Sequence, residues 1–524
     1  MTCSFRLSKI ISIAFILITF SSCVSVEKYN LKLEKPLSVA KLQNDIDYVQ
    51  HKLEKLHPNL YKYISKNELN QKFDSVRNVI NKPMTSKEFF FLVSPIIASV
   101  HQGHMVLSPL FKLVSKKEQK RLKAAGVGPL SQFDFEWMND KLFVIKNRSK
   151  QQSIKVGAEI LSINKITPQY IHDKFRKTIT SDGLNTTYLP RAFSRRFPTY
   201  ITSEIGINDS LSYVFKQNDS VFTTIVSRIK PEKKAKVAND SVVKLEIKKI
   251  SITRKEKRIY GYDETTKTFS KSLSFIKTDS TIALLKIRDF SNGNFKKAYT
   301  ALFQKIKNKK IKTLIIDLRN NPGGKVGDVV NFYSYLTDNE YTMLQKAVVT
   351  SKTSLWKLGV FKKLPIITYP FAALFYPFYM GFSSARVKKE NDGTFTYGLV
   401  GTKMKKSNVN NFKGKIYVII NGTSFSASCL LSAMLKRNPA VTFVGEETGG
   451  GFNSTVAGLL PVLTLPNTKL PLRIGLMDIK TTNQTSVFGH GIYPDKEIVP
   501  TLKDRIEGKD PELDWIITTI KNEK

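Results

Sequence analysis

The stretch from Lys415 to Arg437 constrains the fold of this chain more than any other. It opens with Ile416 to Ile420, a continuous apolar run rich in β-branched residues, which is typical of a strand buried on both faces. Asn421-Gly422 ends that run, and apolar residues then recur with helical spacing at Leu430, Leu431, Met434 and Leu435. The segment therefore predicts a buried strand, a tight turn and a helix.

Serine residues follow this turn, in the sequence Thr-Ser-Phe-Ser-Ala-Ser at 423–428. The start of a helix carries free backbone N–H groups, and the helix dipole there favours developing negative charge. A serine hydroxyl at such a place can act as a nucleophile beside a ready-made oxyanion site. Serine also caps many helices, and this stretch taken alone favours the capping interpretation.

The length and charge of the chain limit its classes of partner. At 524 residues it exceeds one simple core, so two or three domains are expected. Lysine and arginine number 83 against 43 acidic residues, and the formal net charge of +40 would suit nucleic acid, an anionic membrane or an acidic polysaccharide. Neither a basic helix interleaved with aromatics nor a zinc-finger or RNA-binding signature is present, so we expect no nucleic-acid partner.

The N-terminus has the organisation of a secretion signal. Arg6 and Lys9 precede the apolar run Ile10 to Phe20, which is too short to span a bilayer comfortably. The following Phe20-Ser21-Ser22-Cys23 resembles a bacterial lipoprotein signal, which implies cleavage before a lipidated Cys23. We therefore expect a lipid-anchored protein of the bacterial cell envelope, on the periplasmic or surface face of the outer membrane. An ordinary cleaved signal peptide is the alternative.

Cysteine chemistry offers little else. The chain holds only Cys3, Cys23 and Cys429, too few for a disulfide framework and without the spacing of a metal site. If Cys23 carries lipid and Cys3 is lost with the signal, Cys429 remains as a lone buried thiol.

Four regions are expected along the chain. After the signal at 1–23, apolar residues with helical spacing predict a helical domain at 24–110, which ends in Val100-His101-Gln102-Gly103-His104. A β-rich region follows at 128–265, where Val156 to Asn164 resembles the turn and strand of a PDZ domain, a module that binds peptides at a sheet edge. At 270–524, strands alternate with helices, which predicts an α/β core with parallel strands.

One stretch of this last region is unusual. Leu355 to Phe382 is rich in aromatic residues and contains Pro365, Pro370 and Pro377, which exclude a straight membrane-spanning helix. Three interpretations remain open: an amphipathic segment that touches a membrane, a lid over a hydrophobic cleft, or a buried insertion packed on the core.

Four separated motifs occur along the second half of the chain. They are DLRNNPGG at 317–324, NGTSFSAS at 421–428, VGEETGGG at 444–451 and GHGIYPD at 489–495. In this order they resemble the motifs of the S41 peptidases, which include the C-terminal processing proteases and the tricorn core protease. The resemblance implies a ClpP/crotonase-like α/β catalytic core that acts on peptides or proteins without a metal or organic cofactor. It leaves the oligomeric state open.

The resemblance also assigns a nucleophile and a base. Ser426 is the implied nucleophile, with Ser424 and Ser428 as structural turn and cap residues. The lysine base of the C-terminal processing branch falls on Gly451, so the Ser–Lys dyad is absent. Gln102-Gly103-His104 instead resembles the "DGH" signature of the tricorn branch, which implies His104 as general base. His101 is the nearest alternative, and a surface or capping role suits it better.

The remaining site residues follow from the same motifs. The backbone N–H groups of Gly323 or Gly324 and of Ala427 are the implied oxyanion hole. Glu446 is the candidate acid to orient His104, although it or the adjacent Glu447 could instead support the glycine turn. Asp317 and Arg319 favour a structural ion pair.

These residues together predict a serine peptidase that acts through an acyl-enzyme. Two alternatives stay open. One is a catalytically inactive lipoprotein that binds peptides, and the other is a hydrolase of the same fold that acts on esters or cell-wall peptides.

Overall fold

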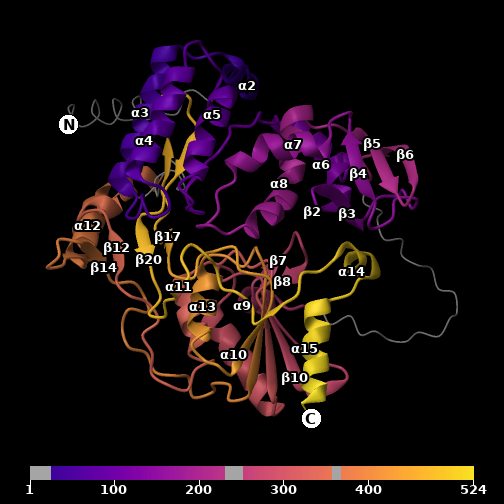
Figure 1. Ribbon diagram of the computed structural model, residues 1–524, viewed down its shortest axis with the longest axis vertical. Coiled ribbons are helices and arrows are strands. Elements are labelled where there is room, and N and C mark those ends of the chain that lie inside the picture. The colour runs from indigo at the N-terminus through magenta and orange to yellow at the C-terminus, as the bar shows by residue number, and fades with distance from the viewer. Residues whose placement is uncertain (1–24, 231–251, 357–367, 524) are drawn as a thin grey trace, which may run out of the picture.

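A computed structural model describes residues 25–230, 252–356 and 368–523 of the chain. The signal segment 1–23, with Cys23, lies outside these residues. Figure 1 shows an upper lobe, formed by the N-terminal helices and a β-rich unit, above a lower lobe that is the α/β core. Within the described ranges, no helix has the length and apolar character to cross a bilayer.

The N-terminal helices follow the apolar periodicity of the sequence. In helix α3 (Val39–Leu56) an apolar residue recurs at every third or fourth position and is buried, as at Leu42, Ile46, Val49 and Leu53. A short strand, β1 (Val106–Leu107), begins two residues after His104 and pairs antiparallel with β19 (Pro471–Arg473). The helices are α2 (Val26–Glu34), α3 (Val39–Leu56), α4 (Lys66–Val79) and α5 (Ser86–Ala98).

The strand pairing of β1 joins the front of the chain to its last third. β19 also pairs antiparallel with β18 (Val462–Thr464), so the three strands form a small sheet in the order β1-β19-β18. Its register places Val106 opposite Arg473. His104, two residues before Val106, is thereby held close to the C-terminal half.

The β-rich unit is a five-stranded antiparallel sheet with its own apolar core. Trp137, Val144, Phe193, Phe197 and Phe215 are buried between the sheet and its helices. The strands, in sheet order, are β2 (Phe133–Met138), β3 (Lys141–Asn147), β4 (Glu159–Ile163), β5 (Ser210–Gln217) and β6 (Ser220–Ser227). The helices are α6 (Lys116–Ala125), α7 (Pro168–Phe175) and α8 (Tyr188–Ile205), with short 3-10 turns at Leu130–Gln132 and Arg176–Thr178.

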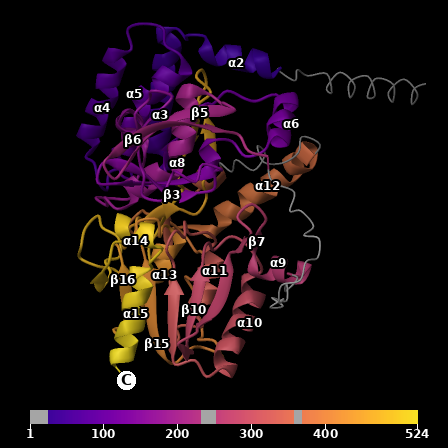
Figure 2. The same cartoon turned by 90° about the vertical axis from the view of Figure 1, so that its right-hand side faces the viewer.

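The core is a six-stranded sheet in the order β21-β16-β15-β11-β10-β9, parallel except for the edge strand β9. Helices α10, α11 and α13 cover one face and α15 covers the other, as Figure 2 shows from the side. The predicted α/β fold is confirmed, and all five residues from Ile416 to Ile420 are buried. The strands are β9 (Lys271–Ile276), β10 (Asp279–Ile287), β11 (Thr313–Asp317), β15 (Lys415–Ile420), β16 (Val441–Gly445) and β21 (Lys496–Glu497). The helices are α10 (Phe295–Asn308), α11 (Val326–Tyr333), α13 (Ala427–Leu435), α14 (Leu502–Glu507) and α15 (Pro511–Asn522).

A second, smaller sheet lies beside the core and carries helix α12 (Tyr369–Arg386). This helix includes Pro377 and buries only Ser383, so the interpretation of Leu355 to Phe382 as a buried insertion is wrong for α12. The small sheet runs in the order β13 (Val387–Lys389), β14 (Phe395–Tyr397), β12 (Ala347–Val349), β20 (Met477–Ile479) and β17 (Thr455–Ala457). The minor elements are α9 (Arg254–Tyr260), β7 (Tyr262–Asp263), β8 (Thr268–Phe269) and the 3-10 turn η3 (Ser354–Trp356).

Candidate active site

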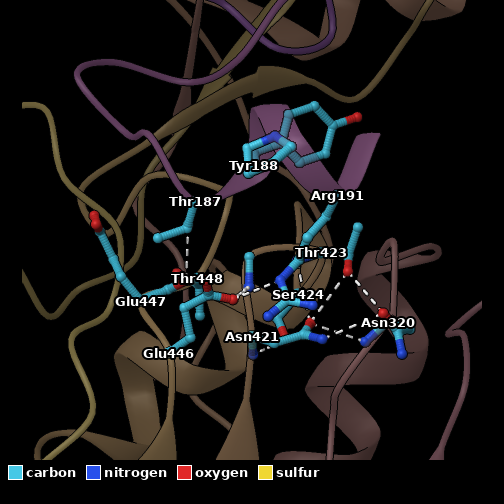
Figure 3. Close-up of polar contacts among 12 residues, drawn as sticks. Thr187, Tyr188, Arg191, Asn320, Asn421, Thr423, Ser424, Glu446, Glu447 and Thr448 are labelled. Carbon is cyan, nitrogen blue, oxygen red and sulfur yellow. Dashed lines mark hydrogen bonds and ion pairs between the residues drawn. The ribbon is translucent and has the colours of Figure 1, made fainter. Parts of the chain in front are cut away.

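The turn after β15 is tied to the end of the neighbouring strand β11 by side-chain hydrogen bonds (Figure 3). Asn421 Oδ1 accepts from the backbone N–H of Asn320 at 3.0 Å and from that of Thr423 at 3.1 Å. Ser424 Oγ donates to the carbonyl of Leu318 at 2.8 Å and accepts from the backbone N–H of Asn421 at 3.1 Å. The polar residues of the NGTS sequence therefore fix the turn to the carboxyl end of the sheet.

Ser426 occupies the position just before α13 and has an unusual backbone conformation. Its φ of 56° and ψ of −117° are rare for a residue with a side chain, and strain of this kind is typical of a nucleophile held on a sharp strand-to-helix turn. Ser426 is partly exposed, whereas Phe425 and Ala427 on either side are buried. Ser426 is thus the one residue of the three that solvent partly reaches.

The two flanking serines differ from Ser426 in both respects. Ser424 and Ser428 are fully buried, and each hydroxyl donates to a backbone carbonyl, Ser428 Oγ to that of Asn321 at 3.0 Å. Both side chains hold the turn and the helix start against the NPGG segment, in the structural role expected for them.

His104 contacts Ser426 directly, although the two residues are 322 positions apart in the sequence. His104 Nε2 lies 2.9 Å from Ser426 Oγ. The carbonyl of His104 accepts a hydrogen bond from Arg473 Nε at 2.9 Å, and the imidazole meets the Phe425 ring edge-on with 5.3 Å between ring centroids. The β1–β19 pairing, Arg473 and Phe425 therefore place the imidazole against the hydroxyl.

The surroundings of His104 keep its imidazole neutral. Burial, and secondarily the positive charge of Arg473, lower the pKa of His104 to about 4. At neutral pH the ring is therefore unprotonated and can accept a proton at Nε2. In the described part of the chain, no carboxylate forms a hydrogen bond with this ring.

The carboxylate closest in role to the predicted acid is Asp182, which holds the backbone around His104. Asp182 Oδ1 accepts from the N–H of Gly103 at 2.6 Å, and its Oδ2 accepts from the N–H of Gly451 at 3.3 Å. Thr180 and Gly183 add bonds to the carbonyls of Gly103 and His101. The loop at 180–183 thereby clamps the histidine turn onto the glycine loop that follows β16.

The Asp182 carboxyl is buried, and burial raises its pKa to about 6 although the two amide donors oppose this shift. The approach of Asp182 and Phe425 also explains Gly103, because a Cβ there would lie 2.4 Å from Phe425 Cζ and 3.0 Å from Asp182 Oδ1. A side chain at this position would push the histidine turn away from the serine.

Replacement of Asp182 by asparagine is expected to lower kcat by about 10- to 100-fold, because the amide offers one acceptor oxygen for two N–H donors and the histidine turn shifts. The wild-type rate should also fall as the pH drops through about 6, because protonation of the Asp182 carboxyl removes an acceptor. The Asp182→Asn substitution should abolish that pH step, as measured by the pH profile of kcat.

An Asp182→Asn enzyme with wild-type kcat and an unchanged profile near pH 6 would contradict the positioning role. Asp173→Asn, at an exposed carboxylate on α7, is the matched control and should leave both quantities as they are.

Of the three predicted oxyanion-hole residues, Gly323 and Ala427 lie beside Ser426, but the amide of Gly323 is already engaged. The N–H of Gly323 donates to Asn321 Oδ1 at 2.9 Å, so it is not free for a substrate. Within the described residues, the N–H groups of Gly324 and Ala427 have no hydrogen-bond acceptor. Gly323 instead allows the NPGG backbone to pack closely against the start of α13, because a Cβ there would lie 2.7 Å from the Ala427 nitrogen.

The predicted pairing of Glu446 with His104 is wrong. Glu446 Oε2 accepts from Arg191 Nε at 2.6 Å and from the N–H of Gly422 at 3.0 Å, so the carboxylate supports the turn after β15. Glu447 Oε1 accepts from the N–H of Gly491 at 2.7 Å and lies 3.2 Å from His490 Nδ1. Both acids buttress the loops, which is the alternative role that the sequence left open.

The other predicted pair is present. Arg319 Nη2 lies 3.0 Å from Asp317 Oδ2, and the same guanidinium also binds Asp510 and Glu512 near the start of α15. The pair therefore fastens the C-terminal helix to the sheet. His101, the alternative base, has a left-handed φ of 54° and offers its carbonyl to Gly183.

Sequence reasoning missed Asp182 and Arg473. Each comes from a segment without a motif, and each acts through a backbone group of the histidine turn, so no local pattern marks it. Only the fold brings them there.

Residues 281–498 match the model of peptidase family S41. This range holds most of β10 and all of β11, β15, α13 and β16, and with them the NPGG turn and Ser426. The fold and the match together define an α/β serine-type peptidase. The predicted resemblance to the S41 peptidases is confirmed over residues 281–498 by this match.

Two solved structures extend the likeness beyond the matched range. The structure of mature CPAF complexed with lactacystin is 15% identical with a TM-score of 0.60, and the alignment covers 92% of this chain and 98% of that one. The crystal structure of mature CPAF on its own is 14% identical with a TM-score of 0.58, with 91% and 96% covered. At these identities the likeness shows the fold. No curated protein sequence matches the chain.

Proposed function

We propose that this S41 peptidase hydrolyses peptide bonds through an acyl-enzyme on Ser426, with His104 as general base. The observation that carries the proposal is the 2.9 Å contact between His104 Nε2 and Ser426 Oγ. The neutral state of His104 and the exposure of Ser426 support it, since a base must be unprotonated and a nucleophile must be reachable.

The proposed reaction follows the serine acyl-transfer scheme. His104 Nε2 takes the proton of Ser426 Oγ as the oxygen attacks the substrate carbonyl, and the N–H groups of Gly324 and Ala427 receive the oxyanion. His104 then gives the proton to the leaving amine. In the second half, His104 takes a proton from water, whose oxygen attacks the acyl carbon, and returns it to Ser426.

This site works as a dyad in which backbone contacts replace the orienting acid. Arg473 and Asp182 hold the carbonyl and the N–H on either side of the His104 turn, so the ring is positioned through its backbone. The positive charge of Arg473 disfavours the imidazolium that forms during attack, while the oxyanion that forms with it favours that ion. We infer that the His104 imidazole stays uncharged in the free enzyme and becomes protonated only as the oxyanion forms.

A fluorophosphonate probe tests the proposal, because it phosphonylates an activated serine and depends little on substrate choice. We expect a single labelled peptide, carrying the probe on Ser426, when the labelled protein is mapped by mass spectrometry. Ser428→Ala should still label. Labelling that is absent, or that maps to another serine, would overturn the assignment.

Assays on the same purified protein distinguish the two alternative functions. An inactive peptide-binding lipoprotein would bind peptides without labelling, and an esterase would hydrolyse small esters but not casein or chain-end peptides. We expect hydrolysis of the peptides.

We further propose that the protein is secreted and anchored to the bacterial cell envelope through lipid on Cys23. The charged start, the short apolar run and the small residues before Cys23 support this proposal. A mature N-terminal peptide whose mass carries acyl chains on Cys23 is the expected result. An unmodified peptide that begins elsewhere would contradict it.

A further inference from the structure

We propose that helix α12 lies on the surface of an anionic lipid bilayer with its outer face inserted among the lipids. The outer face consists of large apolar side chains that are between 60% and 73% exposed, namely Phe371, Leu374, Phe375, Phe378 and Phe382. Their spacing puts them on one side of the helix. A stripe of this size facing water is rare in soluble proteins and marks a surface that meets a partner.

The opposite side of α12 fixes this orientation. Trp356 Nε1 donates to Ser384 Oγ at 2.8 Å, the Tyr379 hydroxyl donates to the carbonyl of Leu355 at 3.0 Å, and the Tyr376 hydroxyl donates to that of Trp356. Ser383, on this inner side, is buried. The helix is therefore held with its phenylalanines outward, and their exposure is a property of the fold.

The composition of α12 suits the boundary between water and lipid. From Tyr369 to Ala385 the helix has no charged residue, and its inner side carries tyrosines. Like every other described helix, it is not long and apolar enough to cross a bilayer. An apolar helix that cannot span but presents aromatic side chains on one face is expected to lie in the plane of the interface.

Cationic groups border the stripe. Arg386 ends the helix with its guanidinium over the Phe382 ring, 5.3 Å from the centroid, and Lys388 and Lys389 follow as exposed residues of β13. Positive charge beside an inserted apolar face is the pattern that anionic headgroups attract. The same charges, and a net charge of +40, disfavour a second copy of the chain as the partner.

Other features on the same side of the molecule fit this orientation. In Figure 2 the start of α2, helix α6 and the outer end of α12 all lie at the right-hand edge. The exposed Leu113 is held to α2 by two hydrogen bonds with Asn30. Helix α6 presents the exposed lysines Lys116, Lys117, Lys120 and Lys123. Lipid on Cys23, three residues before α2, would approach the membrane from this side.

The test uses the full chain reconstituted into vesicles that contain brominated phosphatidylcholine, with or without phosphatidylglycerol. Bromine quenches tryptophan only inside the bilayer, so the substitution Phe378→Trp reports contact of the outer face. Val409→Trp is the matched control, because Val409 is exposed and its neighbour Asn410 accepts a hydrogen bond from Lys307 near the end of α10. Wild type gives the background of the native tryptophans.

We expect the emission added by Phe378→Trp to be quenched by about half or more in vesicles with phosphatidylglycerol, because an interfacial helix sits about 5–10 Å deep. The emission added by Val409→Trp should remain. The pair Lys388→Glu and Lys389→Glu should reduce the quenching. Absence of quenching in Phe378→Trp would overturn the proposal. So would dimerisation of the protein through this face, detected by size-exclusion chromatography. Equal quenching without phosphatidylglycerol would overturn its anionic part.

Discussion

Replacement of Ser426 by alanine is expected to lower kcat for peptide hydrolysis by about 10⁴- to 10⁶-fold, the loss that follows removal of a serine nucleophile. No neighbouring hydroxyl can take its place, because Ser424 and Ser428 are buried and bonded to backbone carbonyls. KM should change little, since the groups that bind the rest of the substrate remain. Steady-state kinetics on one peptide substrate measures both constants.

Ser428→Ala is the matched control for that experiment. It removes a hydroxyl two residues away that acts only on the backbone, so kcat should stay within about tenfold. Thermal unfolding of both variants checks that the fold is intact. Peptide hydrolysis by Ser426→Ala within tenfold of the wild-type rate would exclude Ser426 as the nucleophile.

His104→Ala should produce a loss of similar size, about 10⁴-fold or more in kcat, because the hydroxyl of Ser426 then has no base. The loss should be partly reversed by added imidazole, which can enter the space left by the ring. Such rescue distinguishes a missing base from a disturbed structure, for which added imidazole would do nothing.

The pH dependence of kcat tests whether His104 is the base. In the proposed mechanism His104 acts in its neutral form, and its pKa is lowered to about 4. Activity in the Asp182→Asn background should therefore hold above about pH 5 and fall as the pH drops through about 4. A base of ordinary pKa would lose activity near 6.5 instead. An activity step near 6.5 that persists in this background would show that another histidine is the base.

Much of the core could be predicted from local patterns. The apolar run at Ile416 to Ile420 and the helical spacing after it define β15 and α13, because a strand buried on both faces has no polar positions. The position of Ser426 at the turn follows from the same pattern. His104 was predicted through the resemblance of QGH to a family signature, and the fold does place it beside Ser426.

The supporting groups could not be predicted in this way. Asp182 and Arg473 reach the histidine turn through pairings with segments far along the chain; Arg473 is 369 positions from His104. Glu446 shows the converse error. Its motif suggested that it orients His104, but in the structure its partner is Arg191 on α8. Helix α12 forms although Pro377 lies inside it, since only part of its backbone hydrogen bonding is lost there.

The pairing of β1 with β19 has a consequence for when this enzyme becomes active. The imidazole travels with the front of the chain and the alcohol with the back, and a two-residue strand sets their meeting. Under the proposed mechanism, a partly synthesised or partly opened molecule would be inactive towards nearby proteins, because the base and the nucleophile meet only when both parts of the polypeptide have come together. In that mechanism, complete folding is the condition for activity.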